Sequence, residues 1–233
     1  MSQEDRSHAR RKQTISKFYP PVWGGIETAA WELSEGLARA GVVADVLCSH
    51  QQRATKESKF EAGYRVVRAG TLGVVLSTTM APPMVPQLRR LAAARDILHV
   101  HMPDPMAAAA IWLARPSLPL VLHWHSDVVR QRRAMVLYEP LQTWLLARAD
   151  AIIATSEAYA EASRPLQPWR DKVEVIPIGI SDSRVRAGSQ RAEAIRQQYG
   201  GRRLVFALGR MTYYKGFDVL VDAAASLPDD CAV

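Results

Sequence analysis

The sequence predicts an α/β protein with a doubly wound parallel sheet. Short apolar stretches of strand length alternate with stretches in which apolar residues recur at helical spacing. The strand-length stretches are nearly continuously apolar, which is typical of parallel strands that helices cover on both faces. Hydrophobic residues make up 48% of the chain and charged residues 23%, a balance that favours a globular protein over a disordered chain.

The elements are expected in a regular order. A first strand lies near residues 14–18, and a loop with two glycines separates it from a helix over about 26–40, which Gly41 terminates. In that helix the apolar residues fall on one face. Further strands are expected at 42–49, 64–70, 97–101, 120–125, 151–155 and 173–179, and further helices at 85–95, 105–114, 133–148 and after Ser156.

The chain is expected to comprise three segments. Residues 1–13 form a polar, basic and disordered tail, residues 14–200 a Rossmann-like domain, and residues 201–233 the start of a second Rossmann-like domain. The last segment offers a strand at 204–209, a helix from Phe217 and the beginning of another strand. One strand and one helix cannot bury both faces of a sheet, so we expect the second domain to be truncated.

Charge and chain termini narrow the choice of partners. A formal net charge of +7 with a pI near 9.7 is compatible with an ordinary basic surface, and the more specific interpretations are an anionic membrane face, nucleic acid or phosphorylated substrates. Nucleic acid is disfavoured, because the arginines are scattered along the chain without a nucleic-acid-binding motif. No apolar run reaches the roughly 18–20 residues of a membrane span, and the N-terminus lacks the apolar core of a signal peptide. We therefore expect a cytoplasmic protein in which Cys48 and Cys231 stay reduced.

Four of the six histidines form two His-x-His pairs, each followed closely by an aspartate. Residues i and i+2 of a strand point the same way, so each pair presents two imidazoles on one face. Both pairs lie at the carboxyl ends of their strands, where ligands of such sheets gather. Imidazole and carboxylate groups could ligate metal ions in a hydrolase. The residues concerned are His99, His101 and Asp104, and His123, His125 and Asp127.

Two observations favour a use other than metal binding. No histidine occurs after residue 125 to complete a set of ligands. The first member of each pair also lies deep in an apolar strand, where a hydrogen-bonded core histidine is the commoner outcome. We expect His99, His101 and His123 to be buried structural residues. His125, at the end of its strand and next to a Ser-Asp turn, is expected to face a ligand.

Two glycine loops point to phosphate. The loop YPPVWGG places Gly24 and Gly25 between the first strand and the first helix, where the backbone can approach a ligand and the helix N-terminus attracts an anion. In the second domain, Arg210 and Lys215 lie on one loop just before Gly216 and a helix, and together could clamp a diphosphate. A nicotinamide dinucleotide is not supported, because G-x-G-x-x-G is absent.

Four stretches, in the same order, resemble the family 4 glycosyltransferases, which are retaining enzymes with the GT-B fold. They are SKFYPPVWGGIETAAWELSEGLARAG, LVLHWHSDVVRQ, ADAIIATSEAY with DKVEVIPIGI, and LVFALGRMTYYKGFDVLVDAA. The resemblance extends from about residue 14 to the end of the chain. It implies two Rossmann-like domains, of which the first mainly binds the acceptor and the second a nucleotide-sugar donor, with no metal or other cofactor.

The resemblance also implies roles for individual residues. Gly24 and Gly25 would face the donor phosphate, His125 would lie beside the transferred sugar, and Arg210 and Lys215 would stabilise the leaving diphosphate. The Glu-x7-Glu segment with which the family's second domain holds the donor sugar and ribose is expected past residue 233 and does not occur in residues 201–233. We therefore expect this chain to bind donor poorly and to turn over little. The first strand also departs from the family's pattern, because it is unusually polar for a buried parallel strand.

The favoured hypothesis is a glycosyltransferase that transfers a sugar with retention to a saccharide or lipid-linked acceptor in polysaccharide or glycolipid biosynthesis. Such an acceptor would bring the basic surface and the helix at 85–95 to the inner face of the cell membrane. Two alternatives remain: a metal-dependent hydrolase that uses the two histidine pairs, and a non-catalytic remnant. The remnant would self-associate through its incomplete second domain.

Overall fold

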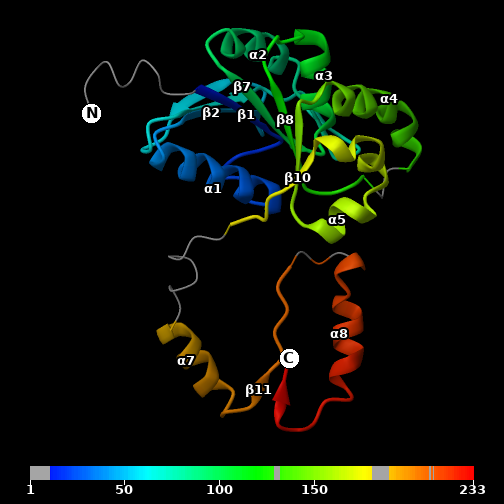
Figure 1. The fold of residues 1–233 in the computed structure, drawn as a ribbon. Coiled ribbons are helices and arrows are strands. Elements are labelled where there is room, and N and C mark those ends of the chain that lie inside the picture. The colour runs from blue at the N-terminus through cyan, green and yellow to red at the C-terminus, as the bar shows by residue number, and fades with distance from the viewer. Residues whose placement is uncertain (1–10, 129–131, 180–188, 210, 212) are drawn as a thin grey trace. The chain divides into compact units, whose positions relative to one another are not determined.

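The computed structural model describes residues 11–128, 132–179, 189–209, 211 and 213–233 (Figure 1). Contacts divide the chain into two units, Met1–Gly179 and Ile180–Val233. The boundary thus precedes helix α7 (Ser189–Gln198), whereas the sequence placed it between residues 200 and 201.

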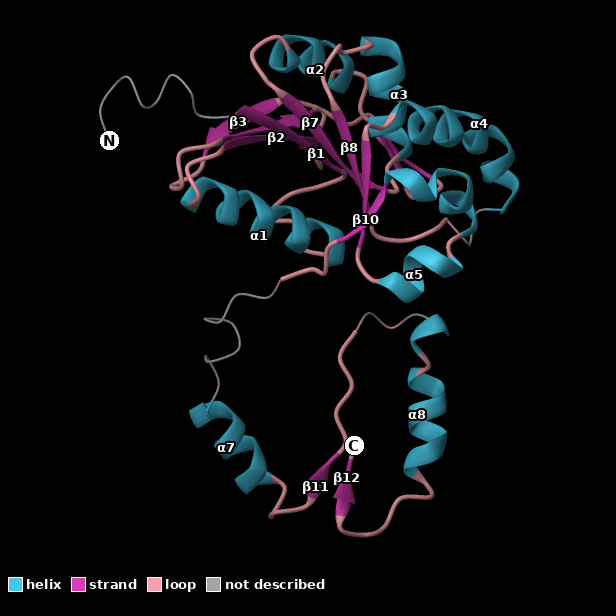
Figure 2. Cartoon of the chain, in the orientation of Figure 1, coloured by secondary structure: helices cyan, strands magenta, loops and turns pink. Residues whose placement is uncertain are grey.

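In its described residues, the first unit is built on an eight-stranded sheet in the order β10-β9-β8-β7-β1-β2-β4-β3 (Figure 2). All neighbours pair in parallel except β3, which pairs antiparallel with β4 at the edge. This confirms the expected doubly wound parallel sheet. The strands are β1 (Arg11–Ser16), β2 (Val43–Ser49), β3 (Lys56–Lys59), β4 (Arg65–Ala69), β7 (Ile97–Met102), β8 (Leu120–Trp124), β9 (Ala151–Ala154) and β10 (Val173–Val175).

Helices cover both faces of this sheet, with α2, α3 and α4 on one side and α1 on the other (Figure 1). Two hydrophobic clusters follow from this arrangement: a larger one beneath α2, α3 and α4, and a smaller one beneath α1. The Ser156 hydroxyl caps the short helix α5, as its sequence position predicts. The helices are α1 (Gly25–Arg39), α2 (Met84–Ala92), α3 (Pro105–Ala114), α4 (Arg132–Arg148) and α5 (Glu157–Ala162), followed by the 3-10 segment η1 (Arg164–Lys172).

Strand β1 begins earlier than the sequence predicted. It starts at Arg11, so residues 11–13 belong to the sheet and not to a disordered tail; residues 1–10 lie outside the described residues. The polar side chains of Gln13, Thr14 and Ser16 are almost fully buried there. Backbone pairing with β2 on one side and β7 on the other holds this polar strand in the centre of the sheet.

The sequence predicted neither β3 nor a small hairpin that follows β4, and it predicted neither η1 nor α7. The polar stretch 50–63 contains β3, whose residues KESK are mostly exposed and so carry no apolar pattern. Lysines on an edge strand discourage pairing with other chains, which explains a strand of this composition. The second element is a small hairpin of β5 (Gly73–Val75) and β6 (Thr78–Met80), which stands apart from the main sheet.

The basic helix expected at 85–95 is shorter, and its cations are engaged within the protein. Arg95 follows α2 and forms a buried ion pair with Asp45, so it does not contribute to the basic outer surface. Arg90 pairs with Glu57 at 3.0 Å, and Arg89 donates to a carbonyl at the end of α3. Within the described part of the chain, no helix combines the length and apolarity needed to cross a membrane.

The second unit contains α7, β11 (Arg203–Leu204), the 3-10 turn η2 (Tyr213–Lys215), α8 (Phe217–Ala224) and β12 (Cys231–Ala232). Strands β11 and β12 pair in parallel, with α8 as their crossover. The helix and the final strand confirm the expected pattern, although β11 is shorter than the apolar stretch 204–209.

Candidate functional site

Four imidazole rings stack along one face of β7 and β8. The register pairs His101 with His123 across the two strands, and His99 and His125 lie two residues away along their own strands. Ring centroids of neighbours lie between 4.3 and 5.5 Å apart, and their planes differ by 9° to 21°. At the carboxyl end, Nδ1 of His101 and Nε2 of His125 are 2.9 Å apart and form a hydrogen bond. The two pairs therefore meet in one row.

Burial keeps this row of histidines neutral. His99, His101 and His123 are buried and His125 is partly exposed, as the sequence predicted. Burial is the main cause that lowers the pKa of all four imidazoles, to about 4 for His123 and about 3 for His125. The positive charge of Lys12 on β1 lowers the pKa of His123 further. At neutral pH each ring therefore offers one donor and one acceptor.

His99, His101 and His123 form a candidate metal-ligand group, since one ring nitrogen of each lies within 4.8 Å of the other two. A zinc ion needs imidazole lone pairs that converge at about 2.0–2.1 Å. In this stack the ring planes are nearly parallel, so the in-plane lone pairs run side by side. The expected carboxylate partner Asp104 caps α3 instead, where it accepts backbone N–H groups at 3.0 and 3.2 Å. The geometry is that of packed histidines.

The second aspartate, Asp127, fixes the turn that follows His125. One carboxylate oxygen accepts three hydrogen bonds, from the indole N–H of Trp124 at 2.8 Å and from the hydroxyls of Tyr159 and Ser163 at 2.7 Å each. These donors come from the end of β8, from α5 and from the residue after α5. Asp127 thus ties the loop beside His125 to two elements, a role that its sequence position alone did not reveal.

The glycine loop lies at the start of α1, as predicted. Gly24 is the N-cap residue and Gly25 the first residue of the helix, and the space around Gly25 is open. A Cβ at Gly24 would meet the carboxylate of Glu27, which already lies near this helix end. The loop is anchored by Tyr19, which is buried and whose hydroxyl lies 2.9 Å from that of Tyr64. The structure thus leaves the backbone at Gly25 accessible and places the acidic side chain of Glu27 beside it.

The second loop belongs to the other unit. Lys215 is exposed and ends η2, and Gly216 follows with a left-handed φ of 65° as the N-cap of α8. Glycine suits this position because other residues rarely adopt that conformation. A Cβ at Gly209 would lie within 3.7 Å of both Phe217 and Lys215, so the loop folds back on α8. Arg210 lies outside the described residues.

Residues 23–184 match the family model described as Glycosyltransferase Family 4. The chain belongs to this family. It is 36% identical to "O-antigen chain mannosyltransferase C" of Escherichia coli over 89% of this chain and 55% of the relative. It is 34% identical to "D-rhamnosyltransferase WbpZ" of Pseudomonas aeruginosa over 86% of this chain and 52% of the relative. The chain thus spans about half the length of these curated relatives.

Solved structures agree on the fold. The chain resembles Anabaena Alr3699/HepE, crystallised with UDP and glucose, with a TM-score of 0.69 and 18% identity over 95% of this chain and 59% of that one. It also resembles an α,α-trehalose-phosphate synthase (UDP-forming) from Burkholderia vietnamiensis, with a TM-score of 0.59 and 15% identity over 95% and 62% of the two chains. At these identities the likeness concerns the fold alone, and it confirms the Rossmann-like α/β architecture of GT-B glycosyltransferases.

Proposed function

We propose that this chain is the acceptor-binding part of an enzyme that transfers mannose, or a close relative, from a nucleotide sugar to a saccharide or lipid-linked acceptor. The observation that carries the proposal is the 36% identity to an O-antigen chain mannosyltransferase across 89% of this chain. A second relative, 34% identical, is a D-rhamnosyltransferase, and D-rhamnose is 6-deoxymannose. Both names therefore support a sugar of the manno series, and the first, which refers to the O-antigen chain, supports polysaccharide biosynthesis.

In the proposed reaction, the bond between the sugar C1 and the leaving diphosphate oxygen breaks, a bond from an acceptor oxygen to C1 forms on the same face, and the proton of the acceptor hydroxyl passes to the departing diphosphate. His125 would hold the sugar through a neutral imidazole, which supplies hydrogen bonds without adding charge. Its Nε2 is engaged with His101, so Nδ1 is the nitrogen that we assign to the sugar. His101 would thereby orient His125.

The cations of the second unit have a separate part in the proposal. Negative charge builds on the departing diphosphate, and Arg210 and Lys215 would lower the barrier by stabilising it. Gly24 and Gly25 would present backbone N–H groups to the donor phosphate. The nearby carboxylate of Glu27 would have to turn away when donor binds, because a phosphate and a carboxylate repel one another.

The proposal includes a location at the inner face of a membrane only for the case in which the acceptor is lipid-linked. Self-association through the second unit is the remaining alternative. It is supported by apolar side chains that are largely exposed there, including Phe206 at 81% and Leu208 at 86%.

A transfer assay tests the function. The protein would be incubated with nucleoside-diphosphate-linked mannose, D-rhamnose or glucose and a synthetic lipid-linked saccharide, and the product's anomeric configuration would be read by NMR. We expect slow transfer of the manno sugars with retention. His125→Ala should reduce the rate of transfer by about a hundredfold, because a sugar held in the wrong position reacts much more slowly. The control His50→Ala, at a histidine outside the row, should stay within about twofold. Transfer of glucose alone, or indifference to His125→Ala, would contradict the proposal.

A further inference from the structure

The glycine loop, residues 19–25, is attached to a strand that is not its neighbour in the chain. It follows β1, and in the sheet β2 separates β1 from β4. From β4, the Arg68 guanidinium donates through Nη2 to the backbone carbonyl of Pro20 at 2.6 Å. Its Nη1 donates to the hydroxyl of Ser58 on the edge strand β3 at 2.7 Å. One side chain therefore joins two strands to the start of the loop.

The charge of Arg68 is not paired with a carboxylate in the described part of the chain. Two other arginines, Arg65 on the same strand and Arg95 after α2, both form ion pairs with Asp45. Pairing of this kind is the usual arrangement for a charge that is partly removed from water. Arg68 is partly buried as well, but its terminal nitrogens donate to a carbonyl and a hydroxyl. Its positive charge therefore stays uncompensated beside the loop.

Tyr19 provides a second attachment of the loop. Its hydroxyl lies 2.9 Å from that of Tyr64, and the Tyr64 hydroxyl donates to a carboxylate oxygen of Glu35 on α1 at 2.7 Å. Because Tyr64 has a single proton to donate, Tyr19 is the donor in the bond between the two hydroxyls. The Tyr19 ring also packs edge-on against Phe60, with ring centroids 5.5 Å apart. These contacts fix the first residue of the loop relative to α1.

The rest of the loop is short and has contacts of its own. The N–H of Val22 donates to the carbonyl of Tyr19 at 3.2 Å, which closes a turn. Trp23 is 56% exposed, but its ring packs edge-on against Trp31 of α1 at a centroid distance of 5.5 Å. The next residue is Gly24, which has no side chain that could hold it in place. The position of the glycine N–H groups therefore depends on the attachments that precede them.

We propose that Arg68 is a positioning residue of the donor site. Through the carbonyl of Pro20 it holds the loop in the conformation in which Gly24 and Gly25 present their N–H groups to the diphosphate. The inference rests on the proposed function, in which this loop contacts the donor phosphate, and adds to it a residue of β4. A loop that is already in place binds an anion without the free-energy cost of ordering it. The unpaired charge of Arg68 favours the same anion.

Kinetics of transfer from nucleoside-diphosphate mannose test the proposal. We expect Arg68→Lys to raise KM for the donor about tenfold, because an ammonium cannot reproduce the planar fork of arginine. The value of kcat should change less than about threefold, because the loop binds the diphosphate before and during transfer. Arg68→Met also removes the charge and should raise KM at least as much. An unchanged KM in both variants, or a loss confined to kcat, would overturn the proposal.

Arg65 provides a matched control on the same strand. It pairs with Asp45 at 3.0 Å and with Glu57 at 3.4 Å, and makes no contact with the glycine loop in the described residues. Arg65→Lys should therefore leave KM for the donor within about twofold of the unmodified value. A mere loss of folded protein would lower kcat and leave KM unchanged. An equal rise in KM for Arg65→Lys and Arg68→Lys would mean that any disturbance of β4 reaches the site, and would overturn the proposal.

Hydrogen exchange of the peptide that contains residues 19–25, followed by mass spectrometry without ligand, gives a measurement that needs no activity. Arg68→Met should accelerate exchange in this peptide about tenfold, and Arg65→Met less than about twofold. An unchanged rate in Arg68→Met would overturn the proposal. A protein that transfers no sugar, although Arg68→Met loosens its loop, contradicts the proposed function alone. A protein that transfers manno sugars with an unchanged KM in Arg68→Lys contradicts this inference alone.

Discussion

The two faces of the central strands differ sharply in chemistry although both are buried. On one face, β1, β7 and β8 contribute Ile15, Leu98, Val100, Leu122 and Trp124, all nearly inaccessible and packed beneath α2, α3 and α4. On the other face, alternate residues of the same strands are Thr14, Ser16, His99, His101 and His123. In the described residues, each of these five has at least one buried polar atom without a hydrogen-bond partner.

The difference indicates which face maintains the fold and which serves the site. An apolar face gains stability from burial and packing, whereas buried polar atoms without partners lose their bonds to water. The polar face ends at His125, at the edge where ligands of such sheets gather. We infer that stability resides in the apolar face and that the polar row is retained for the ligand site that it leads to.

Among the substitutions, removal of a side chain from the apolar face should give the largest effect. Leu98→Ala leaves a cavity in the packed core, and we expect it to lower the free energy of unfolding by about 3 kcal/mol. Urea denaturation followed by circular dichroism measures this loss. A change below about 1 kcal/mol would mean that this face does not dominate stability.

The next prediction concerns the polar row of histidines, which should make the free energy of unfolding depend on pH. His123 has a pKa of about 4 in the folded protein and about 6.5 when unfolded, because burial and then the charge of Lys12 disfavour the imidazolium. Above pH 6.5 its contribution to stability is fully present. As the pH falls from 6.5 to 4, only the unfolded state takes up the proton, and stability falls by up to about 1.4 kcal/mol per pH unit. Urea titrations across this range should show a shallower slope for His123→Leu, and an unchanged slope would contradict the burial of an uncharged histidine.

The turn beside His125 should show a smaller loss. Asp127→Ala leaves the donors of Trp124, Tyr159 and Ser163 without their shared acceptor, and we expect the free energy of unfolding to drop by about 2 kcal/mol. Asp127→Asn keeps one acceptor oxygen and should lose less. Equal stability of both variants and the unmodified protein would mean that the three hydrogen bonds do not hold this turn.

Thr14→Val should have the smallest effect, and it is the substitution that we expect not to reduce the free energy of unfolding. The Thr14 hydroxyl is buried without a partner in the described residues, and valine has nearly the same shape. We expect stability to stay the same or rise by up to about 1 kcal/mol. A loss above about 1 kcal/mol would show that this hydroxyl is hydrogen-bonded, through an ordered water for example, and that the two faces differ less than we infer.

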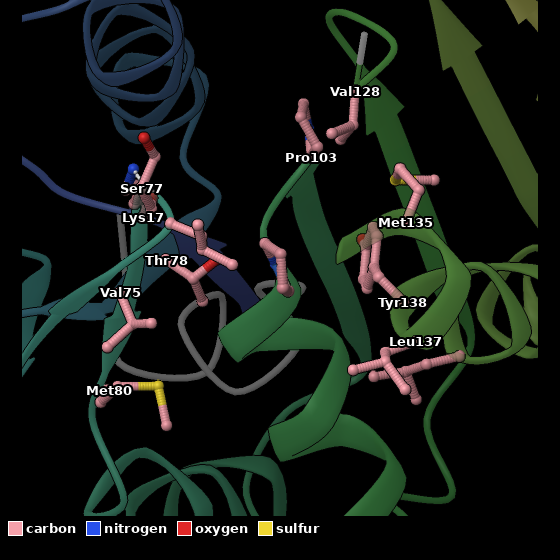
Figure 3. A pocket seen from close by; sticks show the side chains of 13 residues that line it. Lys17, Val75, Ser77, Thr78, Met80, Pro103, Val128, Met135, Leu137 and Tyr138 are labelled. Carbon is pink, nitrogen blue, oxygen red and sulfur yellow. Dashed lines mark hydrogen bonds between the residues drawn. The ribbon is translucent and has the colours of Figure 1, made fainter. Parts of the chain in front are cut away.

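Sequence patterns predicted the apolar face well and the site only in part. Near-continuous apolar stretches predicted β2, β7, β8 and β9, and the i, i+2 spacing predicted that the histidines share a face. Neither pattern could predict β1 from Arg11, because its polar residues are held by pairing on both sides. The hairpin turn at Leu76 and Ser77 departs from ordinary turn chemistry. Lys17 after β1, Met80 of the hairpin and Tyr138 of α4 line one cavity (Figure 3), a proximity that only the fold creates.

The most direct test of the central claim is a ¹⁵N NMR measurement of the four imidazoles at pH 7, with a nucleoside-diphosphate mannose added and then with the nucleoside diphosphate alone. We expect neutral rings throughout, and a shift of His125 that requires the sugar and is far larger than that of His99. A protonated row before addition, or a response confined to the buried rings and elicited by zinc instead of the sugar, would contradict a sugar site at the end of this row.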